Sequence, residues 1–172
     1  NHVFVQADYS QFELRLAAYL SGDKDLIDQF NRDVDVHTTT AAEVYDRRPE
    51  DISKNMRRDA KVVNFGVMYG LSTHGLVAAT GMSYVQAKEF IEKYFKVRPK
   101  LKEYIESVKQ KAKEKGYVEN IYGRRRPTPD VQSSNFMIRE GGLRAAVNMP
   151  FQGSAADIMK KAMVKVQEKL DD

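Results

Sequence analysis

The chain has 172 residues, of which 42% are hydrophobic and 30% charged, and its formal net charge is +4; this composition is typical of a globular domain with a sizeable core. No apolar run reaches about 18 residues, so the sequence excludes a membrane-spanning helix. No signal peptide is recognisable either. The absence of cysteine excludes disulfide bonds and thiolate metal sites and fits a reducing compartment.

The charges are unevenly distributed along the chain. Residues 1–50 hold five basic and ten acidic side chains, whereas residues 96–126 hold eleven basic and four acidic ones. A basic stretch this dense indicates a polyanionic partner. A solvated face of a Lys-rich helix would explain it equally well.

The first quarter of the chain predicts one strand followed by three short helices. Residues 3–7 are β-rich and end at Asp8, which predicts a strand that delivers a carboxylate at its carboxyl end. Apolar periodicity then predicts three helices, the second capped by Asp23, over residues 12–20, 23–30 and 37–45. The strand has no evident sheet partner and no initiating methionine precedes it, so we expect a fragment of a longer protein.

The central feature is a predicted helix over residues 54–69, which Gly70 ends. Two cations and then two aromatic rings recur along it at every fourth residue: Arg57, Lys61, Phe65 and Tyr69. Successive members lie about 6 Å apart on a slowly winding stripe. This order suits a nucleoside triphosphate, with its phosphates at the cations and its sugar and base at Phe65. By spacing alone, a solvated face followed by core aromatics is the commoner explanation.

The remainder predicts further helices and one hairpin. Short helices cover residues 73–79 and 83–95, with Ser83 and Gln86 at capping-box spacing, and a Lys-rich helix runs from Pro99 to Gly116. A small hairpin with a basic tip follows over residues 117–126. Two final helices, joined around Pro150 and Gly153, are predicted over residues 134–149 and 154–170.

Two motifs carry a resemblance to a known family. Arg-x-x-x-Lys-x-x-x-Phe-Gly-x-x-Tyr-Gly at residues 57–70 resembles the nucleotide-binding finger helix of family A DNA polymerases. Asp-Tyr-Ser-Gln-Phe-Glu-Leu-Arg at residues 8–15 resembles that family's metal-binding palm motif, with Phe12 in place of the usual isoleucine. The change at Phe12 predicts altered packing near the sugar pocket. The resemblance covers essentially the whole chain.

The resemblance implies an α+β, mainly helical fold: the fingers subdomain of a right-hand polymerase with an incomplete palm. Residues 1–20 would be a palm segment with the metal-binding motif. Residues 21–115 would be fingers helices, including the nucleotide-binding helix at about 53–69. Residues 116–172 would form a basic hairpin and palm-side helices that contact primer–template DNA.

The implied activity is template-directed DNA synthesis, in which a nucleotide is transferred from a dNTP to a primer 3′-OH by a two-metal mechanism. The metals would be two Mg²⁺ ions, with Mn²⁺ as an alternative, held in part by the Asp8 carboxylate and the Tyr9 carbonyl. Asp8, Arg57 and Lys61 would be catalytic. The family's second carboxylate motif, His-Asp-Glu, is absent, so we expect the isolated chain to be inactive.

The resemblance assigns nucleotide binding to seven residues: Gln11, Glu13, His37, Arg57, Lys61, Phe65 and Tyr69. Glu13 would exclude a ribose 2′-OH and pair with Tyr69, and His37 would contact the triphosphate. Without the resemblance, Glu13 would be a solvated helix charge and His37 an ordinary residue at a helix start. The choice between Phe and Tyr at position 65 would govern tolerance of nucleotides that lack a 3′-OH.

DNA contacts are assigned to two groups of side chains and to Tyr69. Three polar residues at spacing four, Arg144, Asn148 and Gln152, resemble the helix that probes the minor groove, whose acceptors are nearly alike for all correct pairs. A basic run at the hairpin tip would contact backbone phosphates and make binding sensitive to salt: Arg124, Arg125 and Arg126.

Two other functions stay open. One is a fragment of a single-subunit RNA polymerase, which Glu13 argues against because a ribonucleotide enzyme needs room at the 2′ position. The other is a catalytically silent nucleic-acid-binding module. The expected partners are primer–template DNA and dNTP, with no membrane, for a monomer in the bacterial cytoplasm that associates with the nucleoid.

Overall fold

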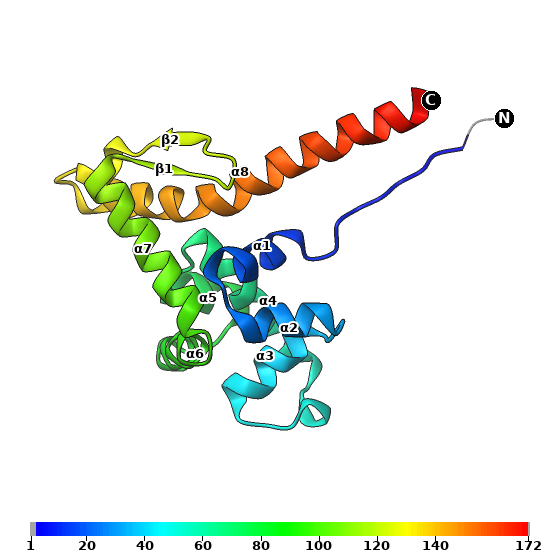
Figure 1. The fold of residues 1–172 in the computed structure, drawn as a ribbon. Helices are drawn as coiled ribbons and strands as arrows, with labels where there is room; N and C mark the ends of the chain where they lie inside the picture. Colours follow the sequence, from blue (N-terminus) through cyan, green and yellow to red (C-terminus); the bar gives the residue numbers. More distant parts are fainter. Residues whose placement is uncertain (1–2, 172) are drawn as a thin grey trace.

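The computed structural model of this chain describes residues 3–171 (Figure 1). The described part is mainly helical with one small antiparallel sheet, so the expected α+β class is confirmed. The α-helices are α1 (Phe12–Ser21), α2 (Lys24–Asn31), α3 (Val36–Tyr45), α4 (Lys54–Gly66), α5 (Thr73–Thr80), α6 (Tyr84–Val97), α7 (Pro99–Lys115) and α8 (Phe136–Asp171). The sheet pairs β1 (Tyr117–Glu119) with β2 (Arg125–Pro127), and three 3₁₀-helices are η1 (Pro49–Asp51), η2 (Val67–Tyr69) and η3 (Pro129–Gln132).

Side-chain caps explain where most of these helices begin. The side chains of Asp23, Asp35, Ser53, Ser72 and Ser83 each accept a hydrogen bond from a backbone N–H in the first turn of the helix that follows. Such bonds satisfy donors that have no partner within the helix. The capping box predicted from Ser83 and Gln86 is confirmed, because both of its hydrogen bonds are present.

The strand predicted at the N-terminus does not form. Residues 3–9 are an extended segment without a ladder partner, and Val3, Phe4 and Val5 are exposed. Within residues 3–171 the only strands are β1 and β2, which pair with each other. A β-rich composition was therefore not enough to form the predicted strand, because a strand needs a neighbouring strand for its backbone hydrogen bonds.

The two helices predicted for the C-terminus are one continuous helix, α8, with Pro150 inside it. Proline removes one backbone donor and usually kinks a helix rather than ending it when packing holds both sides. Met149, Pro150 and Phe151 are buried, and the Ser154 hydroxyl donates to the Pro150 carbonyl. Figure 1 shows α8 changing direction along its length, with the hairpin beside its first half.

One hydrophobic core joins most of the helices. Its fully buried members include Leu14 on α1, Met68 on η2, Leu101 on α7 and Phe151 on α8. In Figure 1, α8 and the hairpin lie along one edge, α7 descends from the hairpin to α6, and α1 to α4 pack beside them. Within the described residues no helix combines the length and apolar character needed to cross a bilayer.

A buried arginine lies where α6 ends and α7 begins. Arg98 is 1% exposed, and its Nη2 lies 2.6 Å from Glu43 Oε2 on α3. The same guanidinium donates to the Val97 carbonyl at 3.2 Å and to Gln29 Oε1 on α2 at 3.5 Å. A buried charge is tolerated only when it is paired and hydrogen-bonded. Arg98 therefore ties α2 and α3 to the α6–α7 junction.

Candidate active site

The predicted stripe lies on α4 and η2. Arg57 and Lys61 are exposed, Phe65 is half-buried, and the helix tightens into η2 before Tyr69. The predicted helix is thus α-helical only to Gly66, and its last turn is a 3₁₀-helix with about three residues per turn. Gly70 then ends it at φ 69°, a left-handed conformation that favours glycine.

The cationic end of the stripe meets the start of α3. Arg57 donates from Nε to Asp35 Oδ2 at 2.7 Å and from Nη2 to Asp35 Oδ1 at 3.2 Å. Asp35 also caps α3 by accepting from the backbone N–H of His37 at 3.1 Å. Partial burial raises the pKa of Asp35, but hydrogen bonds from Arg57 and Thr38 and the Arg57 charge outweigh it and lower that pKa to about 2.

His37 is buried beside this ion pair. Its Nδ1 lies 3.1 Å from Asn64 Nδ2, and its ring centroid is 5.7 Å from that of Phe65. Burial and the charges of Arg57 and Lys61 lower the pKa of His37, against the opposing charge of Asp35. The lowered pKa favours the neutral imidazole. Because an amide nitrogen can only donate, Nδ1 accepts from Asn64 and the ring proton lies on Nε2.

The other end of the stripe meets α1 and α8. The Tyr69 hydroxyl donates to Glu13 on α1, the pair that the resemblance implies. Burial, the hydrogen bond to Glu13 and the Glu13 charge raise the pKa of Tyr69, and the side chain of Gln152 on α8 lowers it. Tyr69 is thus in the neutral form and lies between a carboxylate and an amide.

Gly70 lets α8 approach closely. A Cβ at Gly70 would lie 2.5 Å from Arg144 Cγ, so any larger residue would push Arg144 away. Further along α8, Asn148 Oδ1 is buried without a hydrogen-bond partner among the described residues, and Gln152 is exposed. The three predicted minor-groove residues therefore lie on the part of α8 that packs against η2.

Residues 7–11 precede α1 and hold the predicted metal ligands. Asp8 and Tyr9 are exposed, and together with Ala7 they form one wall of a groove whose other wall is the C-terminal half of α8. Gln11 has φ 52°, and its Oε1 is buried with no hydrogen-bond partner within residues 3–171. A non-glycine residue in this conformation is uncommon and is found often at functional sites.

The oxygen donors of Asp8 and Tyr9 suit a hard divalent cation. No group of three or more His, Cys, Asp or Glu side chains comes together within residues 3–171. Within the described residues, Asp8 and Tyr9 alone therefore do not complete a metal site.

The arginines of the hairpin are placed differently from one another. Arg124 donates from Nε and Nη2 to Asp157 on α8, at 3.0 Å each, and Asn120 donates to the same carboxylate at 2.6 Å. The hydrogen bonds from Arg124 and Asn120 lower the pKa of Asp157 to about 2. Arg125 lies over the Tyr117 ring at 4.5 Å, and Arg126 is exposed. Arg124 thus joins the hairpin to α8.

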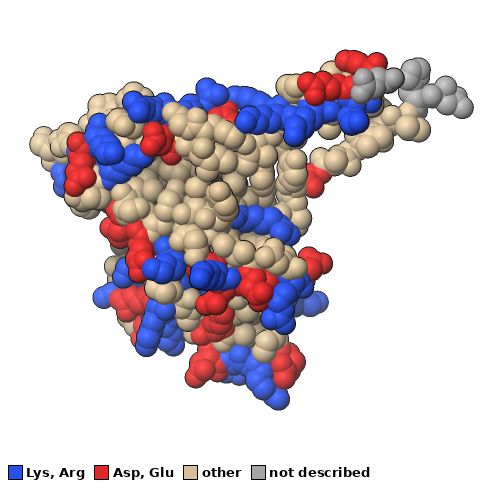
Figure 2. Space-filling model, viewed as in Figure 1, with Lys and Arg blue, Asp and Glu red and all other residues tan. Residues whose placement is uncertain are grey.

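Lysine and arginine side chains gather along one edge of the molecule. Figure 2 shows blue side chains along α8 and the hairpin, with a few red ones at either end of this edge, whereas red and blue are more evenly mixed over the opposite end. The basic stretch at residues 96–126 contributes to this edge through the hairpin.

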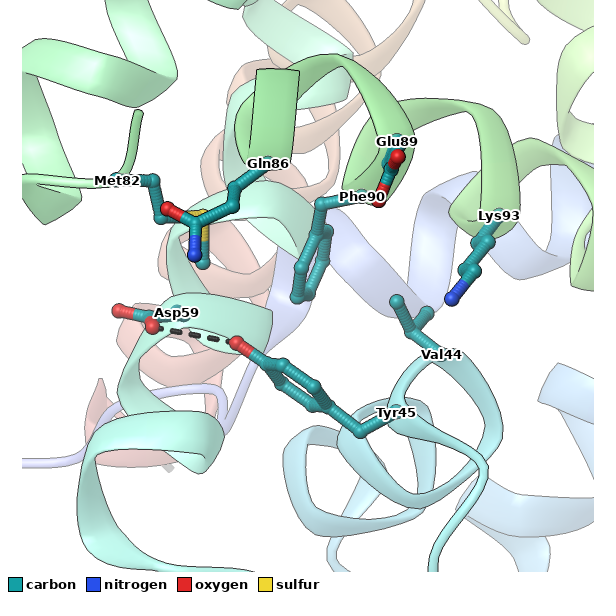
Figure 3. A pocket seen from close by; sticks show the side chains of 8 residues that line it. All are labelled: Val44, Tyr45, Asp59, Met82, Gln86, Glu89, Phe90 and Lys93. Atoms are coloured by element: carbon teal, nitrogen blue, oxygen red, sulfur yellow. Dashed lines mark hydrogen bonds between the residues drawn. The ribbon is translucent and has the colours of Figure 1, made fainter. Parts of the chain in front are cut away.

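A separate pocket lies between α3, α4 and α6 (Figure 3). The Tyr45 hydroxyl donates to Asp59 Oδ2 at 3.3 Å, and burial together with Asp59 raises the pKa of Tyr45 to about 12. Asp59 lies on the buried side of α4, whereas Arg57 and Lys61 are exposed. The pocket is therefore on the side of α4 away from the candidate site.

Two residues of the site were missed by sequence reasoning. Asp35 carries a usable signal, because an aspartate just before a helix start predicts an N-cap. Asn64 carries none, since its role depends on the packing of α4 against α3.

The comparisons with known proteins agree on one family. The family model described as DNA polymerase family A matches residues 1–172. DNA polymerase I of Bacillus caldotenax is 47% identical over 166 residues, which are 96% of this chain and 19% of that protein. DNA polymerase I of Geobacillus stearothermophilus is 48% identical over 164 residues, which are 95% of this chain and 19% of that protein.

A solved structure is similar in fold. It is the POL domain of Pol1 from M. smegmatis in complex with DNA primer–template and dNTP, with a TM-score of 0.89 and 39% identity over 96% of this chain and 29% of that one. The chain spans about a fifth of the length of the curated relatives that it matches. The chain belongs to DNA polymerase family A.

Proposed function

We propose that this chain binds the incoming dNTP and part of the primer–template in an enzyme that extends a DNA primer at its 3′-OH. The observation that carries the proposal is the arrangement along α4 and η2. Two cations and a neutral histidine gather at one end, and the Tyr69–Glu13 pair lies at the other. A ligand with an anionic tail and a sugar and base matches this order.

The side chains along α4 and the neighbouring His37 would contact different parts of the nucleotide. Arg57 and Lys61 would donate charge-assisted hydrogen bonds to phosphate oxygens, and electrostatic stabilisation of this kind carries much of phosphoryl-transfer catalysis. His37 would donate from Nε2, with its ring held by Asn64 and Phe65. Phe65 would then face the sugar and base.

The metals are part of the same proposal. Asp8 and the Tyr9 carbonyl would hold divalent cations, two Mg²⁺ ions or Mn²⁺ in their place. These ions supply activation of the attacking oxygen and stabilisation of the leaving one. The rest of the metal site needs donors beyond those that the described residues bring together.

The DNA surface follows from α8 and the hairpin. Arg144, Asn148 and Gln152 would probe the minor-groove edge of the terminal pair, beside Tyr69. Arg125 and Arg126 would contact backbone phosphates, with Arg124 placed by Asp157 at the same tip. In the same proposal, residues 1–20 and 116–172 belong to the palm side and residues 21–115 to the fingers of a monomeric bacterial enzyme that acts at the nucleoid.

Primer extension tests the proposal. A complete polymerase that contains this chain is expected to extend a DNA primer with dNTPs in a metal-dependent, template-dependent reaction. Preferential use of ribonucleotides would favour the RNA polymerase alternative. Binding of DNA without extension under any metal would favour the silent binding module.

Glu13→Ala tests the sugar end of the site. Removing the carboxylate opens space beside the 2′ position and frees the Tyr69 hydroxyl, so ribonucleotide incorporation should rise by at least about tenfold relative to deoxynucleotide incorporation. Glu13→Gln is the control, since it keeps the volume and loses only the charge, and should retain most of the discrimination. The measurement is incorporation of both nucleotides opposite one template base. An unchanged ratio in Glu13→Ala would place the 2′ discrimination elsewhere.

A further inference from the structure

The donors of Arg57 that would bind a phosphate are already occupied. Its Nε and Nη2 both reach the carboxylate of Asp35, at 2.7 and 3.2 Å. A guanidinium pairs with a carboxylate and with a phosphate through the same two-pronged geometry. Arg57 therefore cannot use this edge for Asp35 and for a triphosphate at the same time.

Asp35 is itself held in place by the start of α3. Its Oδ1 accepts from the His37 N–H at 3.1 Å, and its Oδ2 accepts from the Thr38 hydroxyl at 2.7 Å. These bonds do not depend on Arg57. They connect the carboxylate rigidly to the residue next but one, His37, which shares the cationic end of the site.

We propose that Asp35 is a positioning residue that holds Arg57 until a triphosphate takes the guanidinium from it, and that it thereby sets how strongly anionic a ligand must be to bind. This inference rests on the proposed function. While no ligand is bound, Asp35 neutralises Arg57 and fixes its direction. When a polyphosphate arrives, Arg57 exchanges one anionic partner for another, and Asp35 remains on α3 as the cap that places His37.

The proposal predicts a gain in affinity when the Asp35 charge is removed. Asp35→Asn keeps an N-cap acceptor, since Asn and Asp cap helices about equally well. It removes the charge that competes for Arg57. The two side chains are 45% and 42% exposed, and a pair this exposed is weak, so inorganic tripolyphosphate should bind about two- to fivefold more tightly.

A control separates release of Arg57 from a general change in charge. Asp33→Asn makes the same charge change two residues away, at an exposed position whose φ of 54° asparagine tolerates. It should leave tripolyphosphate affinity within about twofold of the parent by the same reasoning on exposed charges. Titration calorimetry of the chain gives the affinity for tripolyphosphate. A thermal unfolding scan shows whether each variant keeps its stability.

A double-mutant cycle tests the route through Arg57. In an Arg57→Leu background, Asp35→Asn should no longer increase affinity. An affinity that falls in Asp35→Asn would show that the carboxylate only orders the site and would overturn the proposal. Equal gains in Asp35→Asn and Asp33→Asn, or a gain that persists without Arg57, would also overturn it while leaving the proposed nucleotide site intact. If neither the parent nor any variant binds tripolyphosphate, both the role of Asp35 and the proposed nucleotide site are contradicted.

Discussion

Lys61→Ala should lower the single-turnover rate of dNTP incorporation by about 10²- to 10³-fold in a complete polymerase that contains this chain, with much less effect on primer–template affinity. Lys61 is exposed one turn after Arg57, and its charge lowers the pKa of buried His37, so it acts on the cationic end of the site. The proposed DNA contacts on the hairpin and on α8 lie on elements other than α4, which carries Lys61. Loss of a preorganised cation should therefore appear in the chemical step.

Lys54→Ala is the matched control for this prediction. Lys54 is an exposed lysine on the first turn of the same helix, outside the four-residue stripe. Its replacement changes the net charge equally and should leave the rate within about twofold, as surface substitutions usually do. Rapid-quench incorporation and a DNA-binding titration distinguish the outcomes. If Lys61→Ala weakens DNA binding and spares the rate, Lys61 is a DNA contact.

Arg98→Leu should lower the free energy of unfolding by about 3 kcal/mol, or roughly a hundredfold in the unfolding equilibrium. Removing one partner of a buried ion pair leaves the other without compensation. Here Glu43 is 30% exposed and can be partly rehydrated, which places the loss at the low end of the usual range for buried pairs. Urea unfolding followed by circular dichroism gives the value, with an unchanged slope required for the comparison.

Two further variants test whether the loss of stability in Arg98→Leu comes from the burial of the ion pair or only from the loss of a charge. Arg32→Leu breaks the exposed pair with Asp28, whose ends are 3.4 Å apart, and should cost less than about 1 kcal/mol. The double variant Arg98→Leu with Glu43→Leu should recover part of the loss, because an apolar pair leaves no buried charge unpaired. Equal losses in Arg98→Leu and Arg32→Leu would mean that Arg98 contributes only as a surface charge does.

Much of the helical fold could be predicted because its signals are local. Asp23, Ser83 and Gly70 act on neighbouring backbone, so the bounds that they set needed no tertiary information. The strand at residues 3–7 failed because pairing is a property of two segments. The break predicted at Pro150 failed because burial on both sides of the proline holds α8 together.

The part of the candidate site that lies along α4 could be predicted from the sequence. Periodicity alone predicts that the two cations and Phe65 of α4 share a face with Tyr69 of η2, and the resemblance supplied their chemistry. The ion pair of Arg57 with Asp35 joins residues 22 positions apart, and the contact of Asn64 with His37 joins residues 27 apart. Neither separation has a periodic signature, so these contacts required the packing of α3 against α4.

The continuity of α8 has a consequence for how distant parts of the molecule keep their register. Its 36 residues measure about 54 Å along the bent helix axis at the usual rise per residue. Gln152, beside Tyr69, and Met159, in the groove facing Asp8, are seven residues apart, which is about 10 Å and close to two full turns. Both therefore lie on one face of a single spacer. The helix fixes the separation of Gln152, at the Tyr69 end of the site, from Met159, in the groove beside Asp8. These two positions cannot shift relative to each other without bending α8 itself.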